Sequence, residues 1–187
     1  MKDIENDIGL FGAIKSGDQK AFEILFKKYY NKLCNYAYLY LRDRPKSEEI
    51  VSDVYMRIWE NKDKIEVNTS LKSYIYRCTR NAVISSVRGT KSLDIFLQEE
   101  DKNIVKFVDS PETLLIKREV VEVYQQMMNQ LPKQAGLVFR LHKMDGLSYK
   151  QIAEVLDLSV KTVENHMGRA LRMMRDMYNE IPDFFTE

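Results

Sequence analysis

Apolar residues recur along most of this chain at intervals of three and four, which is the spacing of one face of an α-helix. The pattern predicts one long helix over residues 19–41 and another over residues 71–87. Asp43 to Pro45 interrupt it after the long helix, and an intervening helix carries its apolar residues on one side from Ile50 to Ile58. We found no segment with the alternation of a β-strand. The periodicity therefore predicts an all-α protein.

One long stretch lacks this pattern. From Gly89 to Ser110 the periodicity fades and acidic residues gather. After Pro111 apolar residues return at helical spacing, and Leu131-Pro132 predicts the start of a further helix. We therefore expect two small helical domains and a linker, with residues 1–90 in the first domain, 91–112 in the linker and 113–187 in the second domain.

Composition excludes several classes of protein. Hydrophobic residues make up 44% and charged residues 30% of the 187 residues, as in soluble helical proteins. No apolar run approaches the roughly 20 residues that cross a bilayer, and no secretory leader is evident, so we expect a cytoplasmic protein. The two cysteines, Cys34 and Cys78, lie within helical patterns, and the two histidines lack neighbouring metal ligands. We expect buried thiols, no metal site and no cofactor.

Positive charge is concentrated in two places, although the formal net charge is only +1. Residues 67–93 contain five cations and no acid. A second cluster near the C-terminus is opposed only by Glu164 and consists of Lys161, Arg169, Arg172 and Arg175. Two separate cationic faces on a nearly neutral protein indicate directed contact with phosphate.

The segment from Leu147 to Arg175 has the pattern of a helix-turn-helix. Ser148 and Gln151 form a capping box, which predicts a short helix from about Tyr149 with Ile152, Ala153 and Leu156 directed inward. Asp157 to Ser159 form the predicted turn, where Asp157 replaces the glycine that such turns often carry. In the second helix one face gathers the apolar residues Val163, Met167, Ala170, Leu171 and Met174.

The opposite face of the second helix carries side chains that read DNA. Such a helix fits the major groove, where Lys, Arg and Asn hydrogen-bond to base edges, while cations nearer the helix end contact phosphates. The alternative is a basic face that is only solvated. The candidate duplex-binding residues are Lys161, Thr162, Asn165, His166, Arg169 and Arg172.

Three segments resemble the sigma-70 family of bacterial transcription initiation factors. Residues 130–175 resemble region four, residues 50–61 (IVSDVYMRIWEN) resemble the region-two helix that grips RNA polymerase, and residues 70–88 resemble the helix that opens promoter DNA. Their order is similar to that of the extracytoplasmic-function (ECF) subclass. The resemblance implies a sigma factor whose partners are core RNA polymerase, promoter DNA and a membrane-associated anti-sigma factor. It implies no enzymatic activity and no small-molecule substrate.

The resemblance also implies a polymerase-binding surface. It consists of Glu49, Ser52, Asp53, Met56 and Arg57. From the residues alone, Asp53 and Arg57 lie one helical turn apart, so a surface ion pair between them is the alternative. Trp59 nearby is expected in the core, because large aromatic side chains are usually mostly buried.

The predicted helix over residues 71–87 has two expected faces. Leu71, Ile75, Cys78 and Ala82 are expected to point inward, and Ser73, Tyr76, Arg77 and Arg80 outward. Cations mixed with an aromatic ring suit single-stranded DNA, although Tyr74 and Tyr76 are equally compatible with structural roles. The resemblance implies that Asn81 and the loop over residues 61–70 hold a flipped base. The candidate residues for opened DNA are Lys72, Tyr76, Arg77, Arg80 and Asn81.

Two other functions compete with this one. A helix-turn-helix regulator would use the same C-terminal motif without polymerase, and such proteins usually dimerise to read palindromes. An enzyme is disfavoured, because no nucleophile with a base, no paired catalytic carboxylates and no cofactor loop emerge from the residue spacing.

Overall fold

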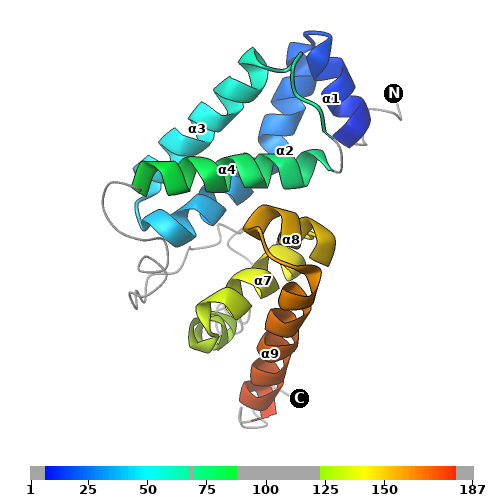
Figure 1. The fold of residues 1–187 in the computed structure, drawn as a ribbon. Coiled ribbons are helices and arrows are strands. Elements are labelled where there is room, and N and C mark those ends of the chain that lie inside the picture. The colour runs from blue at the N-terminus through cyan, green and yellow to red at the C-terminus, as the bar shows by residue number, and fades with distance from the viewer. Residues whose placement is uncertain (1–6, 68–69, 88–122, 180–187) are drawn as a thin grey trace, which may run out of the picture. The chain divides into compact units, whose positions relative to one another are not determined.

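A computed structural model describes residues 7–67, 70–87 and 123–179, and every regular element in these ranges is an α-helix. Contacts between Cα atoms divide the chain into two compact units, each of which is described by itself. The first unit contains α1 (Asp7–Lys15), α2 (Gln19–Leu41), α3 (Arg44–Glu60) and α4 (Leu71–Val87), which are labelled in Figure 1. Further along the chain lie α7 (Lys133–Lys143), α8 (Tyr149–Leu156) and α9 (Val160–Asn179).

The ends of α2 and α3 are set by local hydrogen bonds. The Asp18 carboxylate accepts from the Lys20 and Ala21 backbone N–H groups at 2.8 and 3.2 Å, and so caps α2. Arg42 ends α2 with a left-handed φ of 52°. Asp43 then caps α3 by accepting from the Lys46 N–H at 3.0 Å. The predicted interruption is thus confirmed only at Asp43: Arg42 and Asp43 separate the helices, whereas Arg44 and Pro45, also predicted to interrupt the pattern, belong to the first turn of α3.

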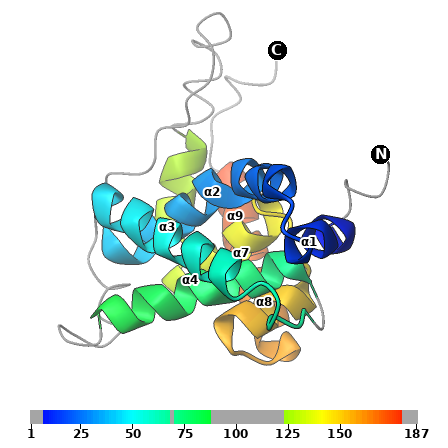
Figure 2. The ribbon, with the colours of Figure 1, turned by 90° about the horizontal axis from the view of Figure 1, so that it is seen from above.

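The core of the first unit forms where α2, α3 and α4 meet. Figure 1 shows α4 crossing α2 and α3, and Figure 2 shows α1 beside α2 and α4. The apolar side of α3 is buried as predicted, at Ile50, Val51, Val54, Tyr55 and Ile58. The periodicity of the sequence therefore predicted α2 and α3 and the inward side of α3.

The short helix α1 is an element that the sequence analysis did not predict. Leu10, Phe11 and Ile14 are buried, whereas Ile8 is 71% exposed, so apolar residues occur around the whole helix and give no clear stripe. Asp7 attaches α1 to α2, because its carboxylate accepts hydrogen bonds from Lys28 Nζ and the Tyr29 hydroxyl, both at 2.7 Å. Burial, and then this bond to Asp7, raise the pKa of Tyr29.

The predicted faces of α4 need a correction. Ser73 and Tyr76, expected to point outward, are buried, and the Tyr76 ring centroid lies 5.4 Å from that of Tyr36 on α2. Cys78 and Ala82, expected to point inward, are only partly buried. The buried stripe is wider than predicted and rotated toward Thr79, because α4 packs against α1, α2 and α3.

The described part of the C-terminal half begins with helical residues 123–130. The predicted start at Leu131-Pro132 is confirmed, since α7 follows directly and packs against α9. The predicted linker over residues 91–112 lies outside the described residues. None of the described helices is long and apolar enough to span a membrane.

The two cysteines are free, and the expectation that both thiols are buried is confirmed for Cys34 only. Cys34 is buried and Cys78 is partly exposed. Burial raises the pKa of Cys34 to about 11, so this thiol is almost entirely protonated at neutral pH. A thiol in this state is a weak nucleophile.

Candidate nucleic-acid interface

Local hydrogen bonds form the start of the helix-turn-helix. The Ser148 N–H donates to Gln151 Oε1 at 2.8 Å, and the Gln151 N–H donates to Ser148 Oγ at 3.3 Å. This is the predicted capping box, and Ile152, Ala153 and Leu156 are buried as predicted. Asp157 then adopts a left-handed φ of 57° and turns the chain.

Helix α9 begins at a second cap. Ser159 Oγ accepts from the Thr162 N–H at 3.0 Å and lies 2.8 Å from Thr162 Oγ1. Val163, Met167 and Ala170 are buried as predicted. Leu171, predicted on the same buried face, is instead 41% exposed, and Met174 is partly exposed. Leu171 lies at the edge of the predicted apolar face, about 80° around the helix axis from Val163, and the described residues leave it exposed.

The opposite side of α9 presents a set of polar and cationic side chains to solvent. The predicted duplex-binding residues Lys161, Asn165, Arg169 and Arg172 are exposed, and Thr162 and His166 are partly exposed beside them. Lys161 Nζ lies 3.4 Å from Glu164, an exposed pair whose attraction is weak in water. We name the surface formed by Lys161, Asn165, Arg169 and Arg172 the α9 face. Its donors are those that recognise base edges and phosphates in the major groove.

On α4 the structure separates the five residues that were predicted to meet opened DNA. Arg77 and Asn81 are exposed one helical turn apart, and Lys72 and Arg80 are partly exposed. Tyr76 is fully buried, so the prediction that its ring stacks on an unpaired base is contradicted. The cations and the amide on α4 are at least partly exposed, whereas the aromatic ring belongs to the core.

Arg80 lies beside a pair of buried tyrosine hydroxyls. The hydroxyl oxygens of Tyr36 and Tyr40 are 3.2 Å apart, and both residues are at most 2% exposed. Burial raises the pKa of both tyrosines, and the nearby Arg80 guanidinium opposes part of that rise. The Arg80 guanidinium therefore lies close to these buried hydroxyls, although the residue is partly exposed.

A groove of about 340 Å³ opens between α3, the loop after it and α4. Its volume lies at the lower end of small-ligand pockets. Asn61 and Asn81 contribute amides to a largely apolar lining, so the loop and the helix that were predicted to hold a flipped base both reach it. The lining residues are Val54, Arg57, Ile58, Asn61, Ile65, Tyr74, Cys78, Asn81, Ala82 and Ser85.

The five predicted polymerase-binding residues lie on one exposed face of α3. Glu49, Ser52, Asp53, Met56 and Arg57 are all exposed, and Met56 is 55% exposed although it is apolar. We name this surface the α3 face. Glu49 forms an ion pair with Lys46 at 2.9 Å. Among the ion pairs of the described residues, none joins Asp53 to Arg57, which was the alternative for these two residues.

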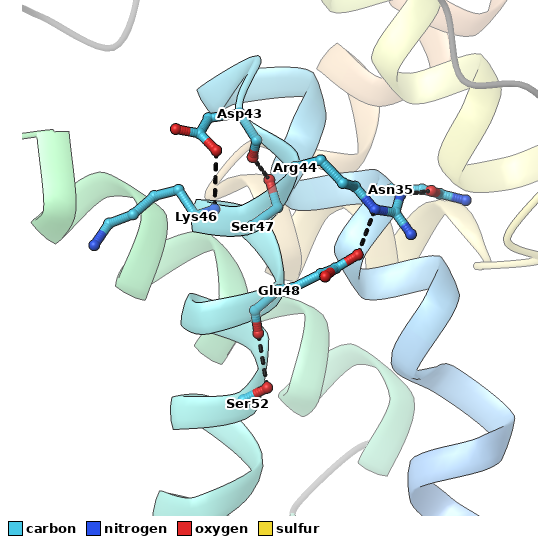
Figure 3. A network of polar contacts seen from close by, with 7 residues as sticks. All are labelled: Asn35, Asp43, Arg44, Lys46, Ser47, Glu48 and Ser52. Carbon is cyan, nitrogen blue, oxygen red and sulfur yellow. Dashed lines mark hydrogen bonds and ion pairs between the residues drawn. The ribbon is translucent and has the colours of Figure 1, made fainter.

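A polar network fixes the start of α3 against α2, as Figure 3 shows. Arg44 donates from Nε to Glu48 and from Nη1 to Asn35 on α2, both at 2.7 Å. Buried Ser47 donates to the Asp43 carbonyl at 2.6 Å. Because Arg44 contacts both helices, the network sets the rotation of α3 and hence the direction of the α3 face.

A cluster of aromatic rings from α2 and α3, which was not predicted from the sequence, lies next to the α3 face. The Phe22 ring on α2 lies 4.9 Å from Trp59, and Phe26 lies 4.9 Å from Tyr55. Lys62 Nζ lies 4.6 Å above the Trp59 ring, a cation–π contact. Trp59, expected in the core, is partly exposed. The large rings at positions 22 and 26, one turn apart at the edge of the apolar stripe of α2, were the available indication.

Groups of acidic residues, His and Cys that could hold a metal ion are absent from the described parts of both units. His142 has a structural contact instead, since its Nδ1 lies 2.8 Å from the Leu147 carbonyl and its ring 4.9 Å from Tyr149.

Two family models match the chain and together cover more than half of it. The model of sigma-70 region 2 matches residues 25–92, which include α3 and α4. The model of sigma-70, region 4 matches residues 122–174, which include α8 and most of α9. The three surfaces described above all lie within these two matches.

Curated relatives match nearly the full chain. The RNA polymerase sigma-H factor of Pseudomonas aeruginosa is 24% identical over 174 residues, 89% of this chain and 90% of the relative. The ECF RNA polymerase sigma-E factor of Escherichia coli K12 is 26% identical over 180 residues, 91% of this chain and 93% of the relative.

Solved structures share the fold. CnrH, in complex with the cytosolic domain of CnrY, matches with a TM-score of 0.61 at 19% identity over 94% of this chain and 99% of CnrH. The sigma factor RpoE of Bartonella quintana, in complex with the anti-sigma factor NepR, matches with a TM-score of 0.59 at 18% identity over 86% of this chain and 98% of RpoE.

Proposed function

The chain belongs to the sigma-70 family of RNA polymerase sigma factors, in its ECF group, and we propose that its three surfaces divide the work of initiation. A sigma factor binds core RNA polymerase and directs it to promoter DNA. A free-standing helix-turn-helix regulator would account for α8 and α9 but not for the region 2 match over α3 and α4. The match to region 2 is the observation that carries this function.

The α9 face is proposed to read the upstream promoter element as duplex DNA. Lys161 and Asn165, near the start of α9, are placed to meet base edges, with Thr162 and His166 at their side. Arg169 and Arg172 are assigned to phosphates, which fix the register of the helix on the duplex.

The exposed and partly exposed residues Lys72, Arg77, Arg80 and Asn81 form what we name the α4 surface. This surface and the groove beside it are proposed to act on the opened promoter. Lys72, Arg77 and Arg80 attract the backbone of the separated strand. Extruding a base costs a few kcal/mol, and the groove offers Asn61 and Asn81 as hydrogen-bonding partners that offset this cost. Tyr76 has no part in this proposal because its ring is buried.

The α3 face is proposed to bind core polymerase. Exposed Met and Arg beside partly exposed aromatic rings are the residue types that are enriched at the centres of protein interfaces. Met56 and Arg57 are the proposed anchors, and Glu49, Ser52 and Asp53 form the polar part of the surface.

We propose that an anti-sigma factor regulates this chain, because two structures of the same fold are complexes with CnrY and with the anti-sigma factor NepR. A membrane-associated anti-sigma factor would hold the protein in the cytoplasm at the inner face of the membrane. The chain is proposed to need no cofactor or small-molecule substrate and to catalyse no reaction of its own. Its two domains are proposed to act at two promoter elements, joined by residues 91–112.

Reconstitution with core RNA polymerase tests this function. Holoenzyme assembled from this chain is offered a library of random promoters, and the transcribed templates are sequenced. We expect transcription that depends on the chain and templates that share two spaced elements. Tight binding of the chain alone, as a dimer, to a palindromic duplex without stimulation of transcription would favour the regulator instead.

A further inference from the structure

Gly168 lies in the interior of α9, where the fold gives no reason for a glycine. It is exposed and has no positive φ. A Cβ atom added to it would meet no other atom within 4 Å. Glycine is among the least favourable residues inside an exposed helix, so alanine would suit the folded protein better.

Three other glycines among the described residues have evident structural reasons. Gly17 and Gly146 occupy turns with φ of 85° and 68°, a conformation that residues with a Cβ rarely adopt. A Cβ on Gly136 in α7 would lie 3.5 Å from Leu131 Cβ, so this glycine lies in a packed region. Gly12 in α1 resembles Gly168, since it is also exposed, helical and without neighbours within 4 Å.

The position of Gly168 separates it from Gly12. At about 100° per residue, Gly168 lies within roughly 60° of Lys161, Asn165 and Arg172 around the helix axis. It therefore lies at the edge of the α9 face, beside Lys161 and Arg172 and about 100° from Arg169, and all of these side chains are exposed. A side chain at this point would stand between the α9 backbone and any duplex that those residues contact.

We propose that Gly168 is a positioning residue that lets the α9 backbone approach the duplex directly. The space that a Cβ would fill is occupied by the DNA, and the flanking side chains then reach base edges and phosphates at hydrogen-bonding distance. This inference rests on the proposed function of the α9 face. It implies that a substitution which stabilises the protein weakens DNA binding, whereas a merely structural residue would affect both in the same direction.

The test compares Gly168→Ala with Gly12→Ala in the full chain. Each variant should raise the unfolding midpoint measured by calorimetry, by about 4 °C or more, because alanine is the better helix former. Holoenzyme is then titrated with a duplex of the upstream element recovered from the promoter selection. Gly168→Ala should weaken binding about tenfold, comparable to the loss of one good groove contact, and Gly12→Ala should leave it unchanged.

Gly168→Leu, a longer side chain with good helix propensity, should weaken binding further. Lys161→Ala plus Arg169→Ala provides the arm that tests the α9 face itself. If this double variant binds poorly and Gly168→Ala binds like the parent, the role of Gly168 is wrong and the α9 face stands. If the double variant binds like the parent, the proposed function of α9 fails.

Discussion

Individual side chains on α4 differ in how firmly the fold holds them. Arg77 is exposed, whereas Arg80 lies beside the buried hydroxyls of Tyr36 and Tyr40. A cation whose side chain is already held in place loses less conformational entropy when it meets a phosphate. Arg80, next in sequence to the groove-lining Asn81, is therefore the cation of this surface that we expect to contribute most to opening.

Replacing both residues tests this expectation. Arg80→Ala plus Asn81→Ala should reduce open-complex formation about tenfold or more, because a phosphate contact and a base-holding amide are lost together. Permanganate footprinting of unpaired thymines measures the opening, and the affinity for core polymerase should stay the same. Asn31→Ala plus Lys32→Ala on α2 likewise removes one amide and one positive charge, from an exposed site, and is the matched control. Equal footprints for the Arg80/Asn81 variant and the parent would contradict the assignment.

The cations of α9 allow a second prediction at this scale. Lys161→Ala plus Arg169→Ala should weaken binding to the upstream duplex and flatten its dependence on salt, because each phosphate contact contributes about 0.9 to the logarithmic slope. Fluorescence anisotropy at several salt concentrations measures both effects. Lys20→Ala plus Lys27→Ala on α2 changes the net charge equally and should preserve the slope. If the affinity fell by the same factor at every salt concentration, so that the slope was unchanged, neither Lys161 nor Arg169 would contact a phosphate.

At the scale of whole elements, the two short connections depend on residues with a left-handed backbone. Arg42 joins α2 to α3 with φ of 52°, and Asp157 joins α8 to α9 with φ of 57°. A residue with a Cβ incurs a steric cost in this conformation, and glycine avoids it. Both connections are tight, so the relative orientation of each helix pair depends on this conformation being kept.

Asp157→Gly should therefore raise the free energy of unfolding, by roughly 0.5–1 kcal/mol after the greater chain entropy of glycine is subtracted. Urea denaturation followed by circular dichroism measures the change. Arg42→Gly in the first unit should give a similar gain for the same reason. Asp157→Asn, which removes the charge but keeps the side chain, separates strain from electrostatics. A gain from Asn as large as that from Gly would show that charge, and not backbone strain, is the cause.

On the scale of the whole molecule, the chain carries three surfaces on three different helices. The α3 face, the α4 surface with its groove and the α9 face share almost no residues, with Arg57 reaching both the α3 face and the groove. Polymerase binding, promoter opening and duplex recognition should consequently be separable by mutation. Linkage of two DNA-binding units also raises the effective concentration of the second contact once the first has formed.

The polymerase contact is predicted to depend on the centre of the α3 face. Met56→Ala plus Arg57→Ala should weaken binding of core polymerase about tenfold to a hundredfold, as expected for anchor residues. Competition against a labelled sigma factor measures the affinity. Ile24→Ala plus Lys27→Ala removes an exposed apolar residue and a cation from α2 and should have no effect. Unchanged affinity of the Met56/Arg57 variant would exclude this face as the main contact.

Features that depend on neighbouring residues could be predicted from the sequence. The bounds of α2 and α4, the capping box of Ser148 with Gln151 and the turn at Asp157 all followed from helical spacing or from hydrogen bonds within a few residues. The exposed cations and amide of α9 followed from the same spacing. Local chemistry determines such features whatever the rest of the chain does.

Tertiary packing alone decided the remainder. The burial of Tyr76 depends on Tyr36, forty residues earlier in the chain. The exposure of Leu171 likewise depends on which side of α9 the other helices pack against. The formation of α1 depends on its contacts with α2 and α4. The open space around Gly168 became evident only when its surroundings were known. Burial is a property of residues that meet in space, and helical periodicity does not specify which distant helices cover a given side.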